Sequence, residues 1–155
     1  MPAILFVCTA NQCRSPIAAA TFVQQLPDNA DPPVWRINSA GTWTKSGMHA
    51  GKYAFRVARL VGIDLGGHKT TSIKDAHPDK YDWIAVMETG HLEALSLEFP
   101  ELKERIHLLT SLAGLNPYEI RDPVNYDLEI SVEIIMDMQD CVRRFYHRLT
   151  TNGGL

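Results

Sequence analysis

The chain has 155 residues, of which 45% are hydrophobic and 21% are charged, and its formal net charge at pH 7 is -3. This length and composition exclude a disordered protein and fit one globular domain, so we expect residues 1–155 to form a single domain. The small negative charge gives no general attraction to nucleic acid or to an anionic membrane, and we expect neither as a partner.

Apolar runs predict four strands. The first is AILFV at residues 3–7, directly ahead of Cys8. The runs WIAVM at 83–87 and RIHLL at 105–109 are also typical of strands that are covered on both faces. VWRIN at 34–38 predicts a weaker fourth strand.

Helical patterns lie between these strands. Ser15 and Pro16 are the residue types that favour an N-cap and a first helical position, so we expect a helix over 15–26. The segments 49–62 and 89–99 predict two more helices, which end near a glycine and before a proline, respectively.

The last predicted helix runs from about residue 128 to residue 149, and it carries one apolar face at helical spacing that should pack on the sheet. Cys141 lies on this face, so we expect it in the core. The tail TNGGL at 151–155 is expected to be a frayed end. The face consists of Ile130, Ile134, Met138, Cys141, Val142, Phe145 and Leu149.

This alternation of strands and helices predicts an α/β fold, a three-layer sandwich with a central four-stranded parallel sheet and helices on both faces. In such folds ligands bind where the carboxyl ends of the strands meet the following loops. Cys8 stands at such an end, and we expect a phosphate-binding loop after the first strand.

The segment CTANQCRS joins this strand end to a helix start. Successive backbone N–H groups there can surround one anion, and the helix dipole adds partial positive charge. Arg14 can hold two oxygens of a tetrahedral oxyanion, while the same field favours the thiolate of Cys8, which would be a nucleophile. Taken singly, Cys8 could be a core cysteine and Arg14 a surface charge, but the whole string favours a catalytic site.

The string VCTANQCRSP closely resembles the signature of low-molecular-weight protein tyrosine phosphatases. The strings SAGT (39–42), GIDLGGHKT (62–70), YDWIAVMETGHLEAL (81–95) and RDP (121–123) follow in the order of that family. The resemblance covers nearly the whole chain. It implies that Cys8 is the nucleophile, that Arg14 binds the phosphate, and that Asp122 is the general acid and base.

The resemblance also implies the residues around the bound phosphate. Ala10 stands where the family usually has glycine. Ser39 and His68 would support the loop through hydrogen bonds with Asn11 and Ser15; without the resemblance they could equally be a turn serine and a surface histidine. The remaining loop would consist of Thr9, Ala10, Asn11, Gln12, Cys13 and Ser15.

Asp122 precedes a proline, so its backbone should be extended and its carboxylate directed away from it; Asp-Pro is equally common as a simple turn. Trp43 and Tyr126 are expected to be aromatic walls for a phenyl ring. The family commonly has tyrosine directly after Asp-Pro, whereas this chain has Val124 and Asn125.

Cys13 has two interpretations. The resemblance suggests a reversible disulfide with Cys8 that would protect the nucleophile from further oxidation. Alternatively, Cys13 only packs against the first helix. The histidines at 49, 77, 91, 107 and 147 show no metal-ligand spacing, so we expect no metal and no cofactor.

The expected function is hydrolysis of phosphotyrosine or another aryl phosphate, with a phosphotyrosine-containing protein as the substrate. We expect a monomer or a weak homodimer in the cytoplasm, because three cysteines suit a reducing compartment and no signal-peptide pattern is present. One alternative is an arsenate reductase that uses the same loop with an external thiol; residues 66–100 contain no relay cysteines. The other is a non-catalytic phosphate-binding module, which would need neither a nucleophile nor an acid.

Overall fold

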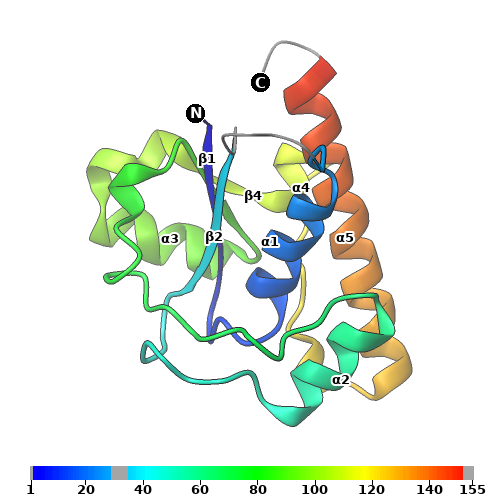
Figure 1. Cartoon of the computed structure of the whole chain (residues 1–155). Coiled ribbons are helices and arrows are strands. Elements are labelled where there is room, and N and C mark those ends of the chain that lie inside the picture. The colour runs from blue at the N-terminus through cyan, green and yellow to red at the C-terminus, as the bar shows by residue number, and fades with distance from the viewer. Residues whose placement is uncertain (1, 29–34, 152–155) are drawn as a thin grey trace.

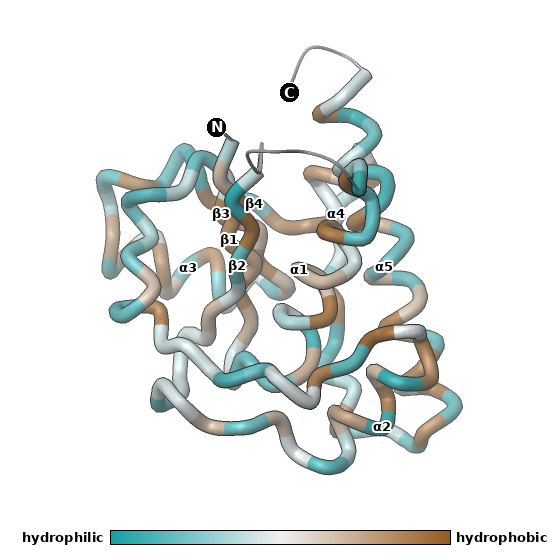
Figure 2. The backbone as a smooth tube through the Cα atoms, in the orientation of Figure 1, coloured by the Kyte–Doolittle hydropathy of each residue, from teal (hydrophilic) through white to brown (hydrophobic). Residues whose placement is uncertain are grey.

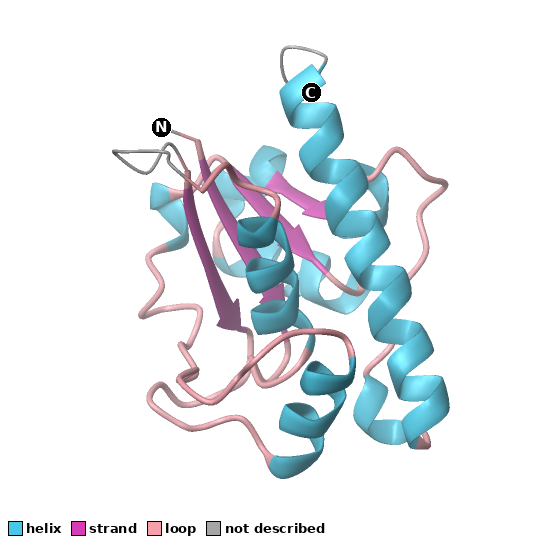
Figure 3. Ribbon diagram, turned by 45° about the vertical axis from the view of Figure 1, so that its right-hand side comes forward, coloured by secondary structure: helices cyan, strands magenta, loops and turns pink. Residues whose placement is uncertain are grey.

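A computed structural model describes residues 2–28 and 35–151 of the chain. Its centre is a four-stranded sheet in which every pairing is parallel and the order is β2-β1-β3-β4 (Figures 1 and 3). The strands are β1 (Ala3–Cys8), β2 (Arg36–Gly41), β3 (Trp83–Val86) and β4 (Ile106–Leu108).

Helices follow each strand. The α-helices are α1 (Arg14–Gln24), α2 (Lys52–Leu60), α3 (Thr89–Glu98), α4 (Leu109–Leu112) and α5 (Leu128–Thr151). The short 3-10 helices are η1 (Pro78–Lys80), η2 (Pro100–Arg105) and η3 (Pro123–Asn125). The chain leaves β1 for β2 on one side and then crosses to β3 on the other, so the direction of winding reverses around β1. The carboxyl end of β1 is therefore the expected ligand position.

Alternate side chains of β1 enter two separate cores. Ile4, Phe6 and Cys8 belong to the core under α1 and α5, whereas Leu5 and Val7 belong to the core under α3 and η2. Side chains of a strand point alternately to opposite faces, so an entirely apolar strand needs a helical layer on each side. Figure 2 shows hydrophobic colour where the strands lie together between the helices. The predicted three-layer parallel fold is confirmed.

Three strands, β2, β3 and β4, have boundaries that differ from the prediction. Strand β2 extends through Gly41 because it pairs with the whole of β1, with Phe6 opposite Ser39 and Cys8 opposite Gly41. This pairing brings the SAGT motif beside the loop after β1. Residues 83–87 and 105–109 each give a shorter strand than predicted, and α4 begins directly at Leu109.

The predicted N-cap of α1 was wrong. The helix already begins at Arg14, since the Ile17 N–H donates to the Cys13 carbonyl at 3.1 Å, and Ser15 lies inside the first turn. Its hydroxyl is therefore not used as a cap, and it contacts Cys8 instead.

Helix α5 confirms most of its predicted core face. Met138, Cys141 and Phe145 are fully buried, but Ile130 is 41% exposed and Ile134 is only half-buried. Both side chains line an open groove beside the segment that precedes η3, and Ile134 also packs against the core. The prediction was wrong for Ile130 because helical spacing cannot tell which turns of a long helix have a neighbour.

Val34 and most of the tail TNGGL lie outside the described residues. Within residues 2–28 and 35–151, no helix is long and apolar enough to cross a membrane.

Candidate active site

The loop that follows β1 turns its carbonyl groups outward. The carbonyl oxygens of Cys8 and Thr9 accept hydrogen bonds from the N–H groups of residues 42 and 43, at 2.9 and 3.0 Å. The Asn11 carbonyl oxygen lies 2.7 Å from Nε2 of His68. Among the described residues, no acceptor takes the backbone N–H groups between Cys8 and the start of α1. The loop therefore offers a set of free donors, which is the arrangement that binds an anion.

Asn11 fixes the curvature of this loop. Its φ of 56° places it in the left-handed region, where asparagine is tolerated better than most residues. Its Nδ2 donates to the hydroxyls of Ser15 at 2.8 Å and Ser39 at 2.9 Å, and its Oδ1 accepts from the Thr71 N–H at 2.9 Å. The structure thus brings Asn11, Ser15, Ser39 and His68 into one hydrogen-bonded set.

Cys8 lies at the bottom of the loop, and its side chain is buried. Its Sγ is 3.0 Å from Oγ of Ser15. Because Asn11 already donates to that oxygen, the Ser15 proton is available for the sulfur, with the Ala40 carbonyl at 3.3 Å as a weaker acceptor. The Ser15 hydroxyl can therefore donate a hydrogen bond to the sulfur of Cys8.

Arg14 is held rigidly from behind. Its guanidinium is buried, and Nη1 donates both to Glu88 Oε2 at 2.8 Å and to the Ile120 carbonyl at 2.7 Å. In the described part of the chain, Nε and Nη2 of Arg14 have no acceptor. These two nitrogens form one edge of the guanidinium, which can hold two oxygens of a phosphate at once.

Asp122 comes from the far end of the chain to the same place. Its backbone is extended, with φ of -70° and ψ of 114°, as expected for a residue before proline. Oδ1 accepts from the Val124 N–H at 3.1 Å, which fixes the carboxyl group; Oδ2 has no partner among the described residues. The second oxygen is thus available to carry a proton.

These groups surround one cavity of about 320 Å³. Ala10 is accommodated in its wall with an exposed side chain and without a left-handed backbone, so the loop closes despite the missing glycine. Gln12 braces the opposite rim, because its Oε1 accepts from the Gly51 N–H at 3.2 Å. The lining includes Cys8, Ala10, Gln12, Arg14, Tyr53 and Asp122.

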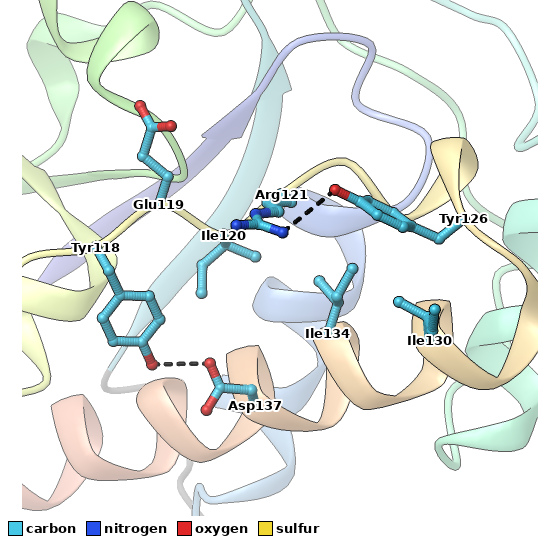
Figure 4. A pocket seen from close by; sticks show the side chains of 8 residues that line it. All are labelled: Tyr118, Glu119, Ile120, Arg121, Tyr126, Ile130, Ile134 and Asp137. Atoms are coloured by element: carbon cyan, nitrogen blue, oxygen red, sulfur yellow. Dashed lines mark hydrogen bonds between the residues drawn. The ribbon is translucent and has the colours of Figure 1, made fainter.

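The two predicted aromatic walls do not line this cavity. The Trp43 side chain is 85% exposed, and only its backbone contacts the loop. Tyr126 faces a separate groove, with its hydroxyl 3.5 Å from Nη1 of Arg121 (Figure 4). Tyr53 takes the expected place: its ring lines the cavity, and its hydroxyl donates to the Tyr126 carbonyl at 2.8 Å, tying α2 to the Asp122 loop.

Sequence reasoning missed Glu88 and His91. The Glu88 N–H donates to Nδ1 of His91 at 3.1 Å, so Nε2 carries the proton and donates to the Thr9 hydroxyl at 2.8 Å. Burial, reinforced by the charge of Arg14, lowers the pKa of His91 to about 4. His91 is therefore neutral at pH 7, and its 3.6 Å approach to the Glu88 carboxylate is not an ion pair there. The position of both residues directly after β3 was the signal that could have found them.

His91 should make stability depend on pH. Its pKa is about 4 when folded and 6.5 when unperturbed, so the unfolded chain binds more protons between these values. The neutral form of His91 therefore contributes up to about 3 kcal/mol to the free energy of unfolding above pH 6.5. This contribution is lost as the pH falls towards 4. Urea unfolding at pH 7 and pH 5 should show that the free energy of unfolding decreases less for His91→Gln than for the unaltered protein. The control is His147→Gln, at an exposed position; equal decreases in both variants would contradict the assignment.

Cys13 is buried, and its thiol is free. Burial, together with the negative charges of Cys8 and Asp122, raises its pKa to about 12. Formation of a disulfide between Cys8 and Cys13 requires a thiolate at one of the two sulfurs. Since Cys13 remains protonated at neutral pH, the thiolate would have to be that of Cys8. The redox role stays a prediction, and the packing role is consistent with the burial. Cys141 is fully buried in the core, as predicted.

Gly41 allows the loop to approach β2. A Cβ at this position would lie 2.6 Å from the Thr9 carbonyl oxygen, closer than Cβ atoms approach other atoms, and 3.1 Å from the Ala10 carbonyl carbon, which is a tight contact. The glycine of SAGT is therefore required by close packing against the anion-binding loop. No cluster of three His, Cys, Asp or Glu residues in the described ranges could hold a metal ion.

Comparison with known proteins identifies the family. The family model described as low molecular weight phosphotyrosine protein phosphatase matches residues 3–153. The chain belongs to this family. A protein-arginine-phosphatase of Geobacillus stearothermophilus is 30% identical over 148 residues, which cover 96% of each chain. The low molecular weight phosphotyrosine protein phosphatase of Mus musculus is 31% identical over 144 residues, which cover 90% of this chain and 89% of the mouse protein.

Solved structures of the family share the fold. The tyrosine phosphatase Wzb from Escherichia coli K30, in complex with sulphate, has a TM-score of 0.82 and 33% identity, and the match covers 95% of this chain and 97% of that one. The YwlE arginine phosphatase from Geobacillus stearothermophilus has a TM-score of 0.85 and 29% identity over 98% of this chain and 95% of that one. The protein is thus a phosphatase of the low molecular weight family, and the family includes members named for tyrosine and for arginine.

Proposed function

We propose that the protein hydrolyses phosphotyrosine or other aryl phosphate monoesters through a phosphocysteine intermediate on Cys8. The observation that carries this proposal is the convergence of Cys8, Arg14 and Asp122 on one cavity whose floor is the set of free loop N–H groups. The substrate phosphate would lie in that cradle, with two of its oxygens on the free edge of Arg14. The loop N–H groups and the Arg14 guanidinium would supply positive charge to the phosphoryl group during transfer.

Two steps follow from these positions. In the first, the Cys8 thiolate attacks phosphorus, the phosphorus–oxygen bond to the aryl group breaks, and Asp122 gives its proton to the leaving oxygen. In the second, ionised Asp122 takes a proton from water, which attacks the phosphocysteine and releases inorganic phosphate. The sulfur leaves as a thiolate, which the hydroxyl of Ser15 stabilises from 3.0 Å.

The role of Asp122 has a specific test. Asp122→Asn removes the proton donor, so phosphoenzyme formation should slow about 10²- to 10⁴-fold for poorly acidic alcohol or phenol leaving groups. Activated phenols such as para-nitrophenol leave without assistance and should be affected much less. Stopped-flow measurement of the burst with a series of aryl phosphates gives both values. An equal loss for good and poor leaving groups would exclude the acid role.

Phosphoarginine is a second candidate substrate. The Geobacillus relative that aligns over 96% of both chains is named a protein-arginine-phosphatase. In addition, the half-buried carboxylate of Asp122 at the cavity wall can pair with a guanidinium as well as protonate a phenolate.

A panel assay decides between the candidate functions. The unaltered protein, with no added metal, is given para-nitrophenyl phosphate, phosphotyrosine peptides, phosphoarginine peptides and arsenate with a small thiol. We expect the highest kcat/KM with phosphotyrosine peptides, and a phosphoryl group on Cys8 in rapidly quenched samples by mass spectrometry. Faster hydrolysis of phosphoarginine would select the second candidate. Thiol oxidation that depends on arsenate and on Cys8 would indicate the arsenate reductase.

A further inference from the structure

A second groove lies beside the catalytic cavity, between the segment 118–121 and the first turns of α5 (Figure 4). Its volume is about 450 Å³, which exceeds that of the catalytic cavity. We call it the α5 groove. It is lined by the aromatic and apolar residues Tyr118, Ile120, Tyr126, Ile130 and Ile134 and by the charged residues Glu119, Arg121 and Asp137.

The floor of the α5 groove is apolar and open. Ile130 is 41% exposed, Ile134 is half-buried, and both point from α5 towards the segment 118–121 (Figure 4). Farther along α5, Met138 is fully buried under its neighbours. Each Å² of apolar surface that a ligand removes from water stabilises the complex by about 25 cal/mol. The floor of the groove therefore favours an apolar side chain of a ligand.

Two carboxylates, of Glu119 and Asp137, and the guanidinium of Arg121 line the groove, and the guanidinium forms no ion pair with either carboxylate. Hydrogen bonds from Thr89 lower the pKa of Glu119, and the charge of Arg121 still contributes to this lowering. Glu119 accepts from the N–H and hydroxyl of Thr89, at 3.0 and 2.5 Å, and Asp137 accepts from the Tyr118 hydroxyl at 2.8 Å. Arg121 reaches only the Tyr126 hydroxyl, at 3.5 Å, and no carboxylate of the described residues lies within 4.0 Å of its nitrogens. The Arg121 guanidinium is therefore the group of the groove that can pair with a carboxylate of a bound ligand, and this pairing has to outweigh the negative charges of Glu119 and Asp137.

The α5 groove and the catalytic cavity share one wall. Asp122 and Val124 line the cavity, whereas Arg121 and Tyr126, in the same short segment, line the groove. The Ile120 carbonyl in the groove floor also accepts from Arg14 at 2.7 Å. A polypeptide that places a phosphorylated residue in the cavity can cross this wall at Val124, which is 52% exposed, and enter the groove.

We propose that the α5 groove binds the polypeptide that flanks the phosphorylated residue of a protein substrate. An apolar side chain of that segment rests on Ile130 and Ile134, and an acidic side chain pairs with Arg121. The proposal rests on the proposed phosphatase function of the adjoining cavity. It makes the protein selective for acidic and apolar neighbours of the phosphorylated residue, although the cavity itself contacts only that residue.

The first arm of the test alters the floor. Ile130→Ser is compared with Met136→Ser, which removes a 56% exposed side chain from the same helix outside the groove. Both side chains are exposed, and serine costs only a few tenths of a kcal/mol in a helix, so both variants should fold. We expect Ile130→Ser to lower kcat/KM for a phosphopeptide with flanking Leu and Asp about tenfold relative to para-nitrophenyl phosphate. Met136→Ser should leave that ratio unchanged. Equal ratios in the two variants would overturn the proposal.

The second arm alters the charge. The unaltered protein and Arg121→Gln each receive the acidic phosphopeptide and its counterpart with Asp replaced by Asn. The kcat/KM values of the two peptides are compared on the same protein. An indirect effect of Arg121→Gln on Asp122 changes both values equally and cancels in their ratio. We expect the unaltered protein to prefer the acidic peptide several-fold at low salt, and Arg121→Gln to lose the preference. A preference that survives the substitution contradicts the pairing.

Two further readouts separate the other outcomes. Sedimentation of Ile130→Ser shows whether a second copy occupies the groove; a change of mass with unchanged peptide kinetics would overturn the proposal. Fluorescence anisotropy gives the Kd of the same peptides without turnover. If the unaltered protein hydrolyses no phosphate ester, the proposed function fails. The groove is then supported only if Ile130→Ser weakens peptide binding and Met136→Ser does not.

Discussion

Replacing Cys8 with serine is expected to abolish turnover of aryl phosphates, with a loss of at least about 10⁴-fold in kcat. A serine hydroxyl at this position is a far weaker nucleophile than a thiolate, and burial raises the pKa of Cys13, the other thiol that lines the cavity, to about 12. The loop N–H groups and Arg14 are unchanged by the substitution, so inorganic phosphate should still bind with a similar Kd. Calorimetric titration and a steady-state assay measure the two quantities separately.

The matched control for Cys8→Ser is Cys141→Ala, which removes a buried thiol from α5 and should retain most of the activity. Appreciable turnover by Cys8→Ser would exclude Cys8 as the nucleophile. Loss of phosphate binding together with turnover would instead indicate that the loop had lost its shape, which far-ultraviolet circular dichroism and thermal unfolding would reveal.

Replacing Arg14 with lysine should lower kcat by about 10³-fold or more, the order of effect that a charge-stabilising arginine has in phosphoryl transfer. Lysine keeps the charge, but it cannot donate from a rigid edge to two phosphate oxygens while it also donates to Glu88 and to the Ile120 carbonyl, as Arg14 can. The loss should fall on kcat more than on KM, because the equatorial oxygens gain charge in the transition state.

Arg144→Lys is the matched control, since Arg144 pairs with Asp140 on the surface of α5 at 3.0 Å. It should leave kcat unchanged. Because Arg14 is buried, urea unfolding of Arg14→Lys must accompany the assay. Wild-type kcat in a stably folded Arg14→Lys protein would refute two-point binding of the phosphate.

Much of the fold could be predicted because its strands are continuous apolar runs. AILFV is buried on both faces as β1, and the runs at 83–87 and 105–109 contain β3 and β4. The side chains of such a strand are buried on both faces only when the sheet lies between two helical layers. The three-layer sandwich was therefore the expected fold. The position of Cys8 at the carboxyl edge of the sheet follows from the same pattern.

Element ends were predicted less well because several residues are used for tertiary contacts. Ser15 has the residue type of an N-cap, yet its hydroxyl contacts Cys8 and Asn11. The strand β2 reaches Gly41 only because β1 offers it a partner that far. Propensity is a weak prior, and a pairing strand or a buried polar network overrides it.

The sequence by itself determined the local part of the site: Cys8, Asn11 and Arg14 lie within residues 8–14, between the end of β1 and the start of α1, and this spacing predicted an anion-binding loop. The tertiary structure alone decided which distant side chains meet them. Glu88 and His91 hold Arg14 and Thr9 because β3 lies next to β1, and Tyr53 rather than Tyr126 lines the cavity because η3 turns Tyr126 towards α5. Sequence spacing fixes neighbours within a turn or a helix, whereas contacts between separate elements depend on how those elements pack.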